Sequence, residues 1–229
     1  MNELSGLGFS MPRRVPLADT VADSIAGAIA SGLFAPGDKI SETVLSEQLG
    51  VSRVPIREAF KILHSQGIVT GEQNRGYRVA PFDHETVRKV LEVRMALEAI
   101  LLRDAVVRWR ANHRMEADLR GPLQQMREAA ARQDRVASLE ADLQFHRAIA
   151  DASDNEIARV LWEAIARHVM IIFSRREYRD DDLNSVVRQH EEFCKFIARM
   201  VEDNADPETT KRGLEDHLLQ VARAKLTGT

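Results

Sequence analysis

An aspartate and a histidine stand four residues apart in the stretch ADLQFHRAIADASDN, at residues 141–155. The apolar residues around Asp142 and His146 recur with helical spacing, and side chains at positions i and i+4 are neighbours on one face of a helix. A carboxylate and an imidazole in contact can share a proton, form a plain hydrogen bond or hold a metal ion. The pair alone leaves these three possibilities open.

A second group of candidate functional residues is basic. Five arginines and lysines lie between residues 52 and 80, against two acidic residues, although the net charge of the whole chain is -3. Such residues neutralise DNA phosphates. Arg53 and Arg57 lie four apart where a helix is predicted to begin, and an arginine at the start of a recognition helix can pair with guanine or hold a phosphate. A single arginine could equally be an exposed helix residue, so the surrounding elements decide.

Three short helices and a hairpin are predicted to position these basic residues. Helical periodicity predicts a first helix over residues 17–31. Ser41 and Ser52 are N-cap candidates for two further helices, each of which ends at a glycine. The segments IVT and YRVAP are typical of two short strands joined by a polar turn, with Arg75 and Gly76 at its tip. This order predicts a winged helix-turn-helix whose tip can meet the minor groove or backbone of DNA.

The rest of the chain is predicted to be entirely helical. After Pro81 the strand pattern disappears, and long amphipathic segments follow, separated by Asn, Asp, Gly or Pro. The predicted segments cover residues 83–113, 115–133, 135–153, 155–177, 182–203 and 206–226. The expected fold class is therefore mainly α, with a flexible N-terminal segment at 1–14, a winged helix-turn-helix DNA-binding domain at 15–81 and an all-helical, six-helix bundle at 82–229.

The composition restricts both location and chemistry. With 44% hydrophobic residues among 229, the chain can build a real core. Its lone cysteine, Cys194, allows neither an intrachain disulfide nor a thiolate zinc site, which favours the cytoplasm. The sequence has no apolar run of the length that a signal peptide or a membrane span requires. We therefore expect neither secretion nor insertion into a membrane.

The run PGDKISETVLSEQLGVSRVPIREAFKILHSQGIV resembles the DNA-binding domain of the GntR family of bacterial transcription regulators. The shared features are a PG turn, a helix that ends in LGVSR, and P-x-R-E-A followed by a leucine and a glycine. The resemblance implies that Arg53, Arg57 and the wing Gly76 contact operator DNA, with Arg75 beside the glycine. Thr43 stands where some members carry another basic residue, which puts that contact in doubt here.

The helical part resembles the FCD domain, named after the C-terminal domain of the fatty-acid regulator. The motifs that carry this resemblance are EVRMALE at 92–98, DLQFHRAIADASDN at 142–155, and the histidines in RQHEEF and LEDHL. Six helices without an extra helix after the winged domain are similar to the vanillate-regulator-type branch. In many FCD domains four matching residues bind a divalent metal. In this chain they are Asp142, His146, His190 and His217.

Three facing helices of a bundle can bring these four residues to one interior point. One carboxylate and three imidazoles suit zinc, nickel or manganese and leave coordination positions open. Arg94 in EVRMALE resembles an arginine that many FCD domains point into the effector cavity, where a guanidinium can bind a carboxylate. An ion pair with Glu98, four residues further along the same helix, is the alternative interpretation.

Together these features predict a ligand-responsive, DNA-binding transcription regulator that is not an enzyme. We expect a homodimer on pseudo-palindromic, double-stranded operator DNA, with a small carboxylate as effector; repression released by the ligand is the common behaviour of the family that the chain resembles. A metal-dependent hydrolase is the alternative, because a metal with open positions can lower the pKa of a bound water. No further carboxylate stands out as its general base. A helical interaction protein without a small ligand is the third possibility.

Overall fold

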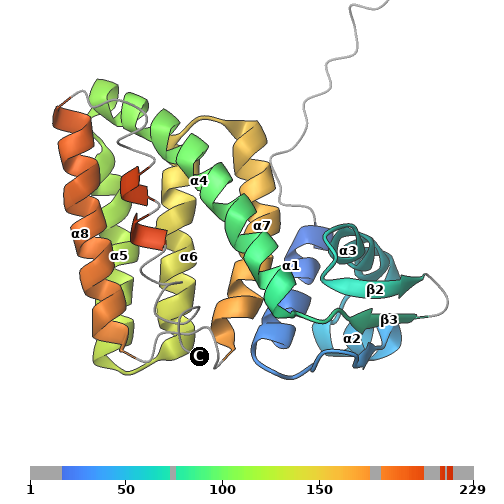
Figure 1. The fold of residues 1–229 in the computed structure, drawn as a ribbon. Coiled ribbons are helices and arrows are strands. Elements are labelled where there is room, and N and C mark those ends of the chain that lie inside the picture. The colour runs from blue at the N-terminus through green and yellow to red at the C-terminus, as the bar shows by residue number, and fades with distance from the viewer. Residues whose placement is uncertain (1–16, 73–75, 176–181, 204–211, 215, 219–229) are drawn as a thin grey trace, which may run out of the picture.

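The computed structural model describes residues 17–72, 76–175, 182–203, 212–214 and 216–218. Within these residues the chain forms a small N-terminal domain with a three-stranded sheet and a larger domain built from helices (Figure 1). The predicted fold class, mainly α with a winged helix followed by a helical bundle, is confirmed. The segment 1–14, which the sequence predicts to be flexible, lies outside the described residues, as does Arg75.

The N-terminal domain is a winged helix-turn-helix. Its elements are α1 (Leu17–Ala30), β1 (Lys39–Ile40), α2 (Glu42–Leu49), α3 (Arg53–Ser65), β2 (Val69–Glu72) and β3 (Gly76–Val79). The strands form one antiparallel sheet in the order β1-β3-β2. The sequence predicts the hairpin of β2 and β3, and the extended piece after the PG turn joins it as β1.

The helix-turn-helix is closed by local signals that the sequence carries. The Ser41 hydroxyl accepts a hydrogen bond from the backbone of α2, and Gly50 ends that helix with a φ of 64°, a left-handed conformation that costs glycine little. Ser52 occupies the N-cap position of α3, as predicted, but its side chain makes no capping hydrogen bond. Phe60 of α3 stacks on Tyr77 of β3, with ring centroids 4.6 Å apart. This contact fixes the recognition helix against the wing.

The helical domain follows the predicted segments closely. Its long helices are α4 (His84–Asn112), α5 (Met115–Ala131), α6 (Arg135–Ala152), α7 (Glu156–Ser174) and α8 (Leu183–Glu202). Residues 212–214 and 216–218 are also helical and lie inside the sixth predicted segment. At the starts of four of these helices a side-chain oxygen accepts a backbone N–H; the capping residues are Asp83, Asp134, Asn155 and Asp182. None of the helices in the described part of the chain has the length and apolar character needed to cross a membrane.

Helix α1 joins the two domains. It packs against α3 on one side and against α7 of the helical domain on the other, so that it lies between them (Figure 1). Arg167 of α7, whose side chain is 8% exposed, donates to Asp23 (2.7 Å) and Asp19 (3.2 Å) of α1. Near the domain junction, Arg175 donates to the carbonyl oxygen of Phe82 (2.7 Å). The two domains therefore share a continuous packed interface with charged contacts across it.

Candidate metal and effector site

Three buried histidines converge in the helical domain. His146 lies on α6, His190 on α8 and His217 on the last described helical turn, and one ring nitrogen from each lies within 4.8 Å of the other two. His217 stacks on Phe193 of α8 with ring centroids 4.1 Å apart, and His190 packs edge-on against Phe145 of α6 at 4.9 Å. The aromatic packing thus holds the three predicted histidine ligands in one cluster.

The orientation of His190 points one of its nitrogens at the cluster. Its Nδ1 lies 2.9 Å from the carbonyl oxygen of Val186, where it can only act as a donor. In a ring whose only proton is on Nδ1, Nε2 carries a lone pair, and this atom lies 3.1 Å from Asp142 Oδ1. A lone pair facing a carboxylate is unfavourable unless a cation, a proton or a metal ion, lies between them. Burial raises the pKa of Asp142, yet contacts with His190 and Arg94 hold that pKa below its ordinary value, so the carboxylate is ionised.

His146 is oriented by a residue to which the sequence assigned no role at the metal. Its Nδ1 lies 2.7 Å from Oε2 of Glu98, a buried carboxylate on α4. The other oxygen of Glu98 accepts from Arg94 Nε (2.7 Å) and from Trp162 Nε1 (3.1 Å). A carboxylate on one ring nitrogen fixes the tautomer and turns the other nitrogen toward a metal. Glu98 therefore has the position of a residue that orients a ligand.

Arg94 forms the ion pair that the sequence offered as its alternative role, and it also lies at the histidine cluster. It forms the buried i, i+4 ion pair with Glu98, and its Nη2 lies 3.9 Å from Asp142 Oδ2. Burial raises the pKa of Glu98, but the charges of Arg94 and His146 outweigh that effect and keep the pKa below its ordinary value. Arg94 thus links the two carboxylates that contact His146 and His190. It also lines a cavity, as the predicted effector role requires.

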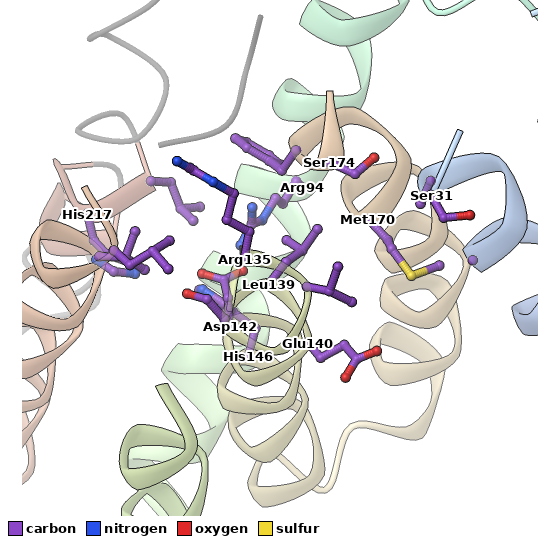
Figure 2. A pocket seen from close by; sticks show the side chains of 18 residues that line it. Ser31, Arg94, Arg135, Leu139, Glu140, Asp142, His146, Met170, Ser174 and His217 are labelled. Carbon is purple, nitrogen blue, oxygen red and sulfur yellow. Dashed lines mark ion pairs between the residues drawn. The ribbon is translucent and has the colours of Figure 1, made fainter. Parts of the chain in front are cut away.

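This cavity has a volume of about 370 Å³, which is within the usual range for small-molecule sites. Figure 2 shows Arg94, Asp142, His146 and His217 gathered toward one side of it. Other walls come from α6, α7 and α8, and α1 of the winged helix completes the lining. The histidine cluster therefore opens onto a space that can hold a small ligand.

The donor atoms fit a divalent metal ion. His146 Nε2 and His217 Nδ1 are buried and make no hydrogen bond with any residue that the structure describes, and the buried His190 Nε2 faces the carboxylate of Asp142. A buried nitrogen without a partner costs about 1–3 kcal/mol. A metal ion that accepted these three lone pairs together with Asp142 would remove that cost. Three imidazoles and a carboxylate are suitable ligands for zinc, nickel or manganese.

Replacing Glu98 by Gln should weaken metal binding about 10- to 100-fold, the usual effect of removing a residue that orients a ligand. The amide keeps the size of the side chain but removes the negative charge that faces His146. Competition with a chelator of known affinity measures the change. Glu163→Gln is the matched control, because Glu163 pairs with Arg147 at a partly exposed position outside the cluster. Equal metal affinity in Glu98→Gln and wild type would contradict the orienting role.

The recognition helix presents its two predicted arginines differently. Arg53 is the first residue of α3 and is exposed. Arg57, one turn later, donates from Nε to Glu42 of α2 (2.9 Å) while its side chain remains 41% exposed. This bond uses Nε, so it does not involve the two terminal nitrogens of the Arg57 guanidinium. The pair holds the guanidinium at the surface of the helix-turn-helix.

The wing contains one of its two predicted contact residues among those described. Gly76 has a φ of 91°, a conformation that side chains rarely adopt, and a Cβ placed there would lie 2.6 Å from Lys39 Cε. Lys39 of β1 is the cross-strand partner of Arg78, so both basic residues stand on one face of the sheet. Lys39 carries no distinguishing signal in the sequence, because only the pairing of β1 with β3 brings it to the wing.

A winged helix-turn-helix packed onto a helical domain with a buried histidine cluster and a cavity defines a DNA-binding transcription regulator with a helical sensor domain. Residues 17–79 match the model of the bacterial regulatory proteins of the gntR family, and residues 89–220 match that of the FCD domain. The chain belongs to the GntR family and carries an FCD domain as its helical part.

Relatives agree with this assignment, and a solved structure has the same fold. The chain is 28% identical to the "Probable D-xylose utilization operon transcriptional repressor" of Paenarthrobacter nicotinovorans over 205 residues, 90% of this chain and 87% of that protein. It is 26% identical to the galactonate operon transcriptional repressor of Escherichia coli (strain K12), covering 82% of this chain and 90% of that one. The E. coli McbR/YncC structure has the same fold, with a TM-score of 0.76 at 20% identity over 93% of this chain and 98% of that one.

Proposed function

We propose that the protein represses transcription from a two-fold operator and that a small carboxylate, bound in the helical domain beside a divalent metal, releases it from DNA. One observation carries this proposal: the buried histidine cluster, Asp142 and Arg94 lie together at a cavity. Repression is supported by two relatives, one named as a probable repressor of a D-xylose utilization operon and the other as the repressor of the galactonate operon. A protein that binds operator DNA must be in the same compartment as the chromosome. This agrees with the cytoplasmic location expected from the lone cysteine.

The proposed metal ligands are Asp142, His146, His190 and His217. When bound, the ion supplies a positive charge with open positions to which a carboxylate oxygen can bind. The protein supplies the orientation: Glu98 holds His146, and the Val186 carbonyl holds His190. Arg94 adds a fixed guanidinium at the same cavity, where it can bind a second oxygen of the ligand. The site is thus proposed to trap an anion between a metal and an arginine.

The test combines metal analysis with operator binding. Elemental analysis of the purified protein should find a divalent metal, and the protein should shift the DNA immediately upstream of its own gene in a mobility assay. Addition of a carboxylate that binds the metal-loaded protein should weaken this shift. A protein that binds this DNA with full response to the acid after chelation would contradict the role of the metal. A protein that never binds this DNA would count against self-regulation through that operator.

We further propose that the helical domain forms the homodimer. Exposed apolar residues recur at seven-residue spacing along α4, at Val93, Ile100 and Val107, and others lie near the start of α7, at Ile157 and Val160. The two helices pack against each other, so both sets belong to neighbouring elements. Single exposed apolar residues need no explanation, but repeated ones on adjacent helices are typical of interfaces. We propose that a second copy of the chain covers this surface, because an operator with two-fold symmetry binds two DNA-binding domains.

Replacing Ile100 and Val107 together by glutamate should convert the dimer to a monomer at micromolar concentration. Two charges buried without partners at an interface are costly, whereas on an exposed surface they cost little. Sedimentation velocity of the full chain measures the oligomeric state. Leu33→Glu is the control, because Leu33 is an exposed apolar residue (66%) that belongs to neither α4 nor α7. A double variant that stays dimeric would place the interface elsewhere.

A metal-dependent hydrolase, the alternative predicted from the sequence, gains no support. The chain belongs to a family of transcription regulators. Of the two carboxylates at the cluster, Glu98 accepts from Arg94 and Trp162 and contacts His146, and Asp142 is itself a proposed ligand of the metal. Neither is placed to take a proton from a metal-bound water as a general base.

A further inference from the structure

The cavity at the histidine cluster is bounded by both domains. Arg94, Asp142 and His217 line one part of it, whereas Gly27 and Ala30 of α1, with Ser31 directly after that helix, line another. Figure 2 shows this arrangement, with Ser31 and His217 on opposite sides and Met170 between Ser31 and α6. A ligand that is anchored at the metal and fills the cavity would therefore touch the DNA-binding domain itself.

Gly27 shows that the α1 wall leaves unfilled space. It lies in the interior of α1, where glycine is less favourable than alanine by about 0.5–1 kcal/mol. A Cβ placed on Gly27 would meet no atom within 4 Å, and its backbone is not in the left-handed region. Neither neighbouring side chains nor backbone geometry of the described structure requires a glycine there. The missing side chain enlarges the cavity, which points to a ligand that occupies this volume.

The chemistry of the wall changes from one end to the other. Arg94 and Asp142 lie beside the histidines, and two exposed charged residues, Arg135 and Glu140, also line the cavity. The wall between the histidines and α1 is mostly apolar, with Leu139, Met170 and Phe173 among its residues. The hydroxyls at the α1 end are already used as donors: Ser31 donates to the Ala28 carbonyl (3.0 Å) and Ser174 to the Ile171 carbonyl (2.8 Å). This end therefore offers few donors to a ligand with many hydroxyl groups, and burying such groups without partners is costly.

We propose that the effector is a carboxylate whose remaining atoms are mainly apolar, and that this apolar part binds directly against Gly27 and Ala30 of α1. The proposal rests on the proposed function, because it takes the carboxylate to be anchored at the metal and Arg94. The ligand then contacts both domains at once. A ligand shifts a conformational equilibrium only when it binds the two conformations with different affinity. Because this ligand would contact α1, its affinity would depend on the position of the winged helix relative to the helical domain.

The test uses three acids on the metal-loaded full-length protein in titration calorimetry. Hexanoate and gluconate have the same number of carbon atoms and the same charge but opposite polarity, and acetate is too short to reach α1. We expect hexanoate to bind at least about tenfold more tightly than gluconate or acetate, since each buried CH₂ contributes about 0.8 kcal/mol. We also expect hexanoate, and not acetate, to weaken operator binding.

The α1 wall is tested by filling it. Gly27→Leu should lower hexanoate affinity at least about tenfold and leave acetate affinity unchanged, because the leucine occupies the apolar end only. Gly27→Ala should have a smaller effect of the same kind, and it favours the helix, so it guards against loss of folding. Ser24→Leu is the matched control, because Ser24 is an exposed residue of α1 outside the cavity wall. It should bind both acids as wild type does.

The outcomes separate this inference from the proposed function. Acids that bind the metal-loaded wild type but bind Gly27→Leu equally well would overturn the α1 wall and leave the anion site intact. Tighter binding of gluconate than of hexanoate would overturn the apolar ligand class. A metal-loaded wild type that binds none of the three acids would overturn both the inference and the proposed carboxylate site.

Discussion

Operator binding should fall about a hundredfold or more when Arg53 and Arg57 are both replaced by alanine. An arginine that reads a base contributes about 1–3 kcal/mol, and the two lie one turn apart at the exposed start of α3. Fluorescence anisotropy with the operator, at one fixed salt concentration, measures the loss. Arg57→Ala alone should account for about 1–3 kcal/mol of it.

Thr43→Ala is the control for this double variant. Thr43 is an exposed residue of α2 on the same helix-turn-helix, and it has no charge with which to bind a phosphate. Its replacement should change operator affinity much less than either arginine does. If the double arginine variant bound the operator as tightly as wild type, α3 would not be the recognition helix.

His190→Ala should lose the bound metal and the response to the acid, and should bind the operator as the chelated wild type does. His190 supplies a proposed ligand and contacts Asp142, so its removal breaks the link between α6 and α8. The winged helix lies in the other domain, and its contacts with the helical domain are made through α1 and the junction rather than α8. Elemental analysis and anisotropy with and without acid test both expectations.

His113→Asn is the matched control for that variant. His113 is an exposed histidine just after α4, with a φ of 54°, and asparagine accepts this left-handed conformation more readily than most residues. The control should keep the metal and the response to acid. A His190→Ala protein with full metal content and full response would show that Asp142 and His146 have a structural role only.

The helices and their ends could be predicted from the sequence because the signals are local. Ser41, Asp83 and Asn155 each accept a hydrogen bond from a backbone N–H within three residues. The start of each helix can therefore be predicted from residues that are close in the sequence. The closeness of Asp142 and His146 follows in the same way from helical spacing. Ser52 shows the limit, since it has the right position but its side chain makes no bond.

The environment of the site could not be predicted in the same way, because it depends on contacts between distant segments. Glu98 was visible as a partner of Arg94 on its own helix, but its contact with His146 spans two helices and its contact with Trp162 spans 64 residues. The same holds for Lys39, which reaches the wing through strand pairing. Gly27 lies inside the predicted first helix, where glycine is unfavourable, but no sequence pattern shows that it faces a cavity.

The bonds of Arg167 to Asp19 and Asp23 limit how freely the two halves of this regulator can be exchanged with those of relatives. A chimera joined near residue 82 would keep Arg167 in its helical domain but would replace both aspartates together with the DNA-binding domain. Unless the donor carries acidic residues at matching places on its first helix, the guanidinium would be buried without a counter-charge. Synthetic-biology designs that recombine such modules should therefore transplant the acidic face of α1 together with the sensor.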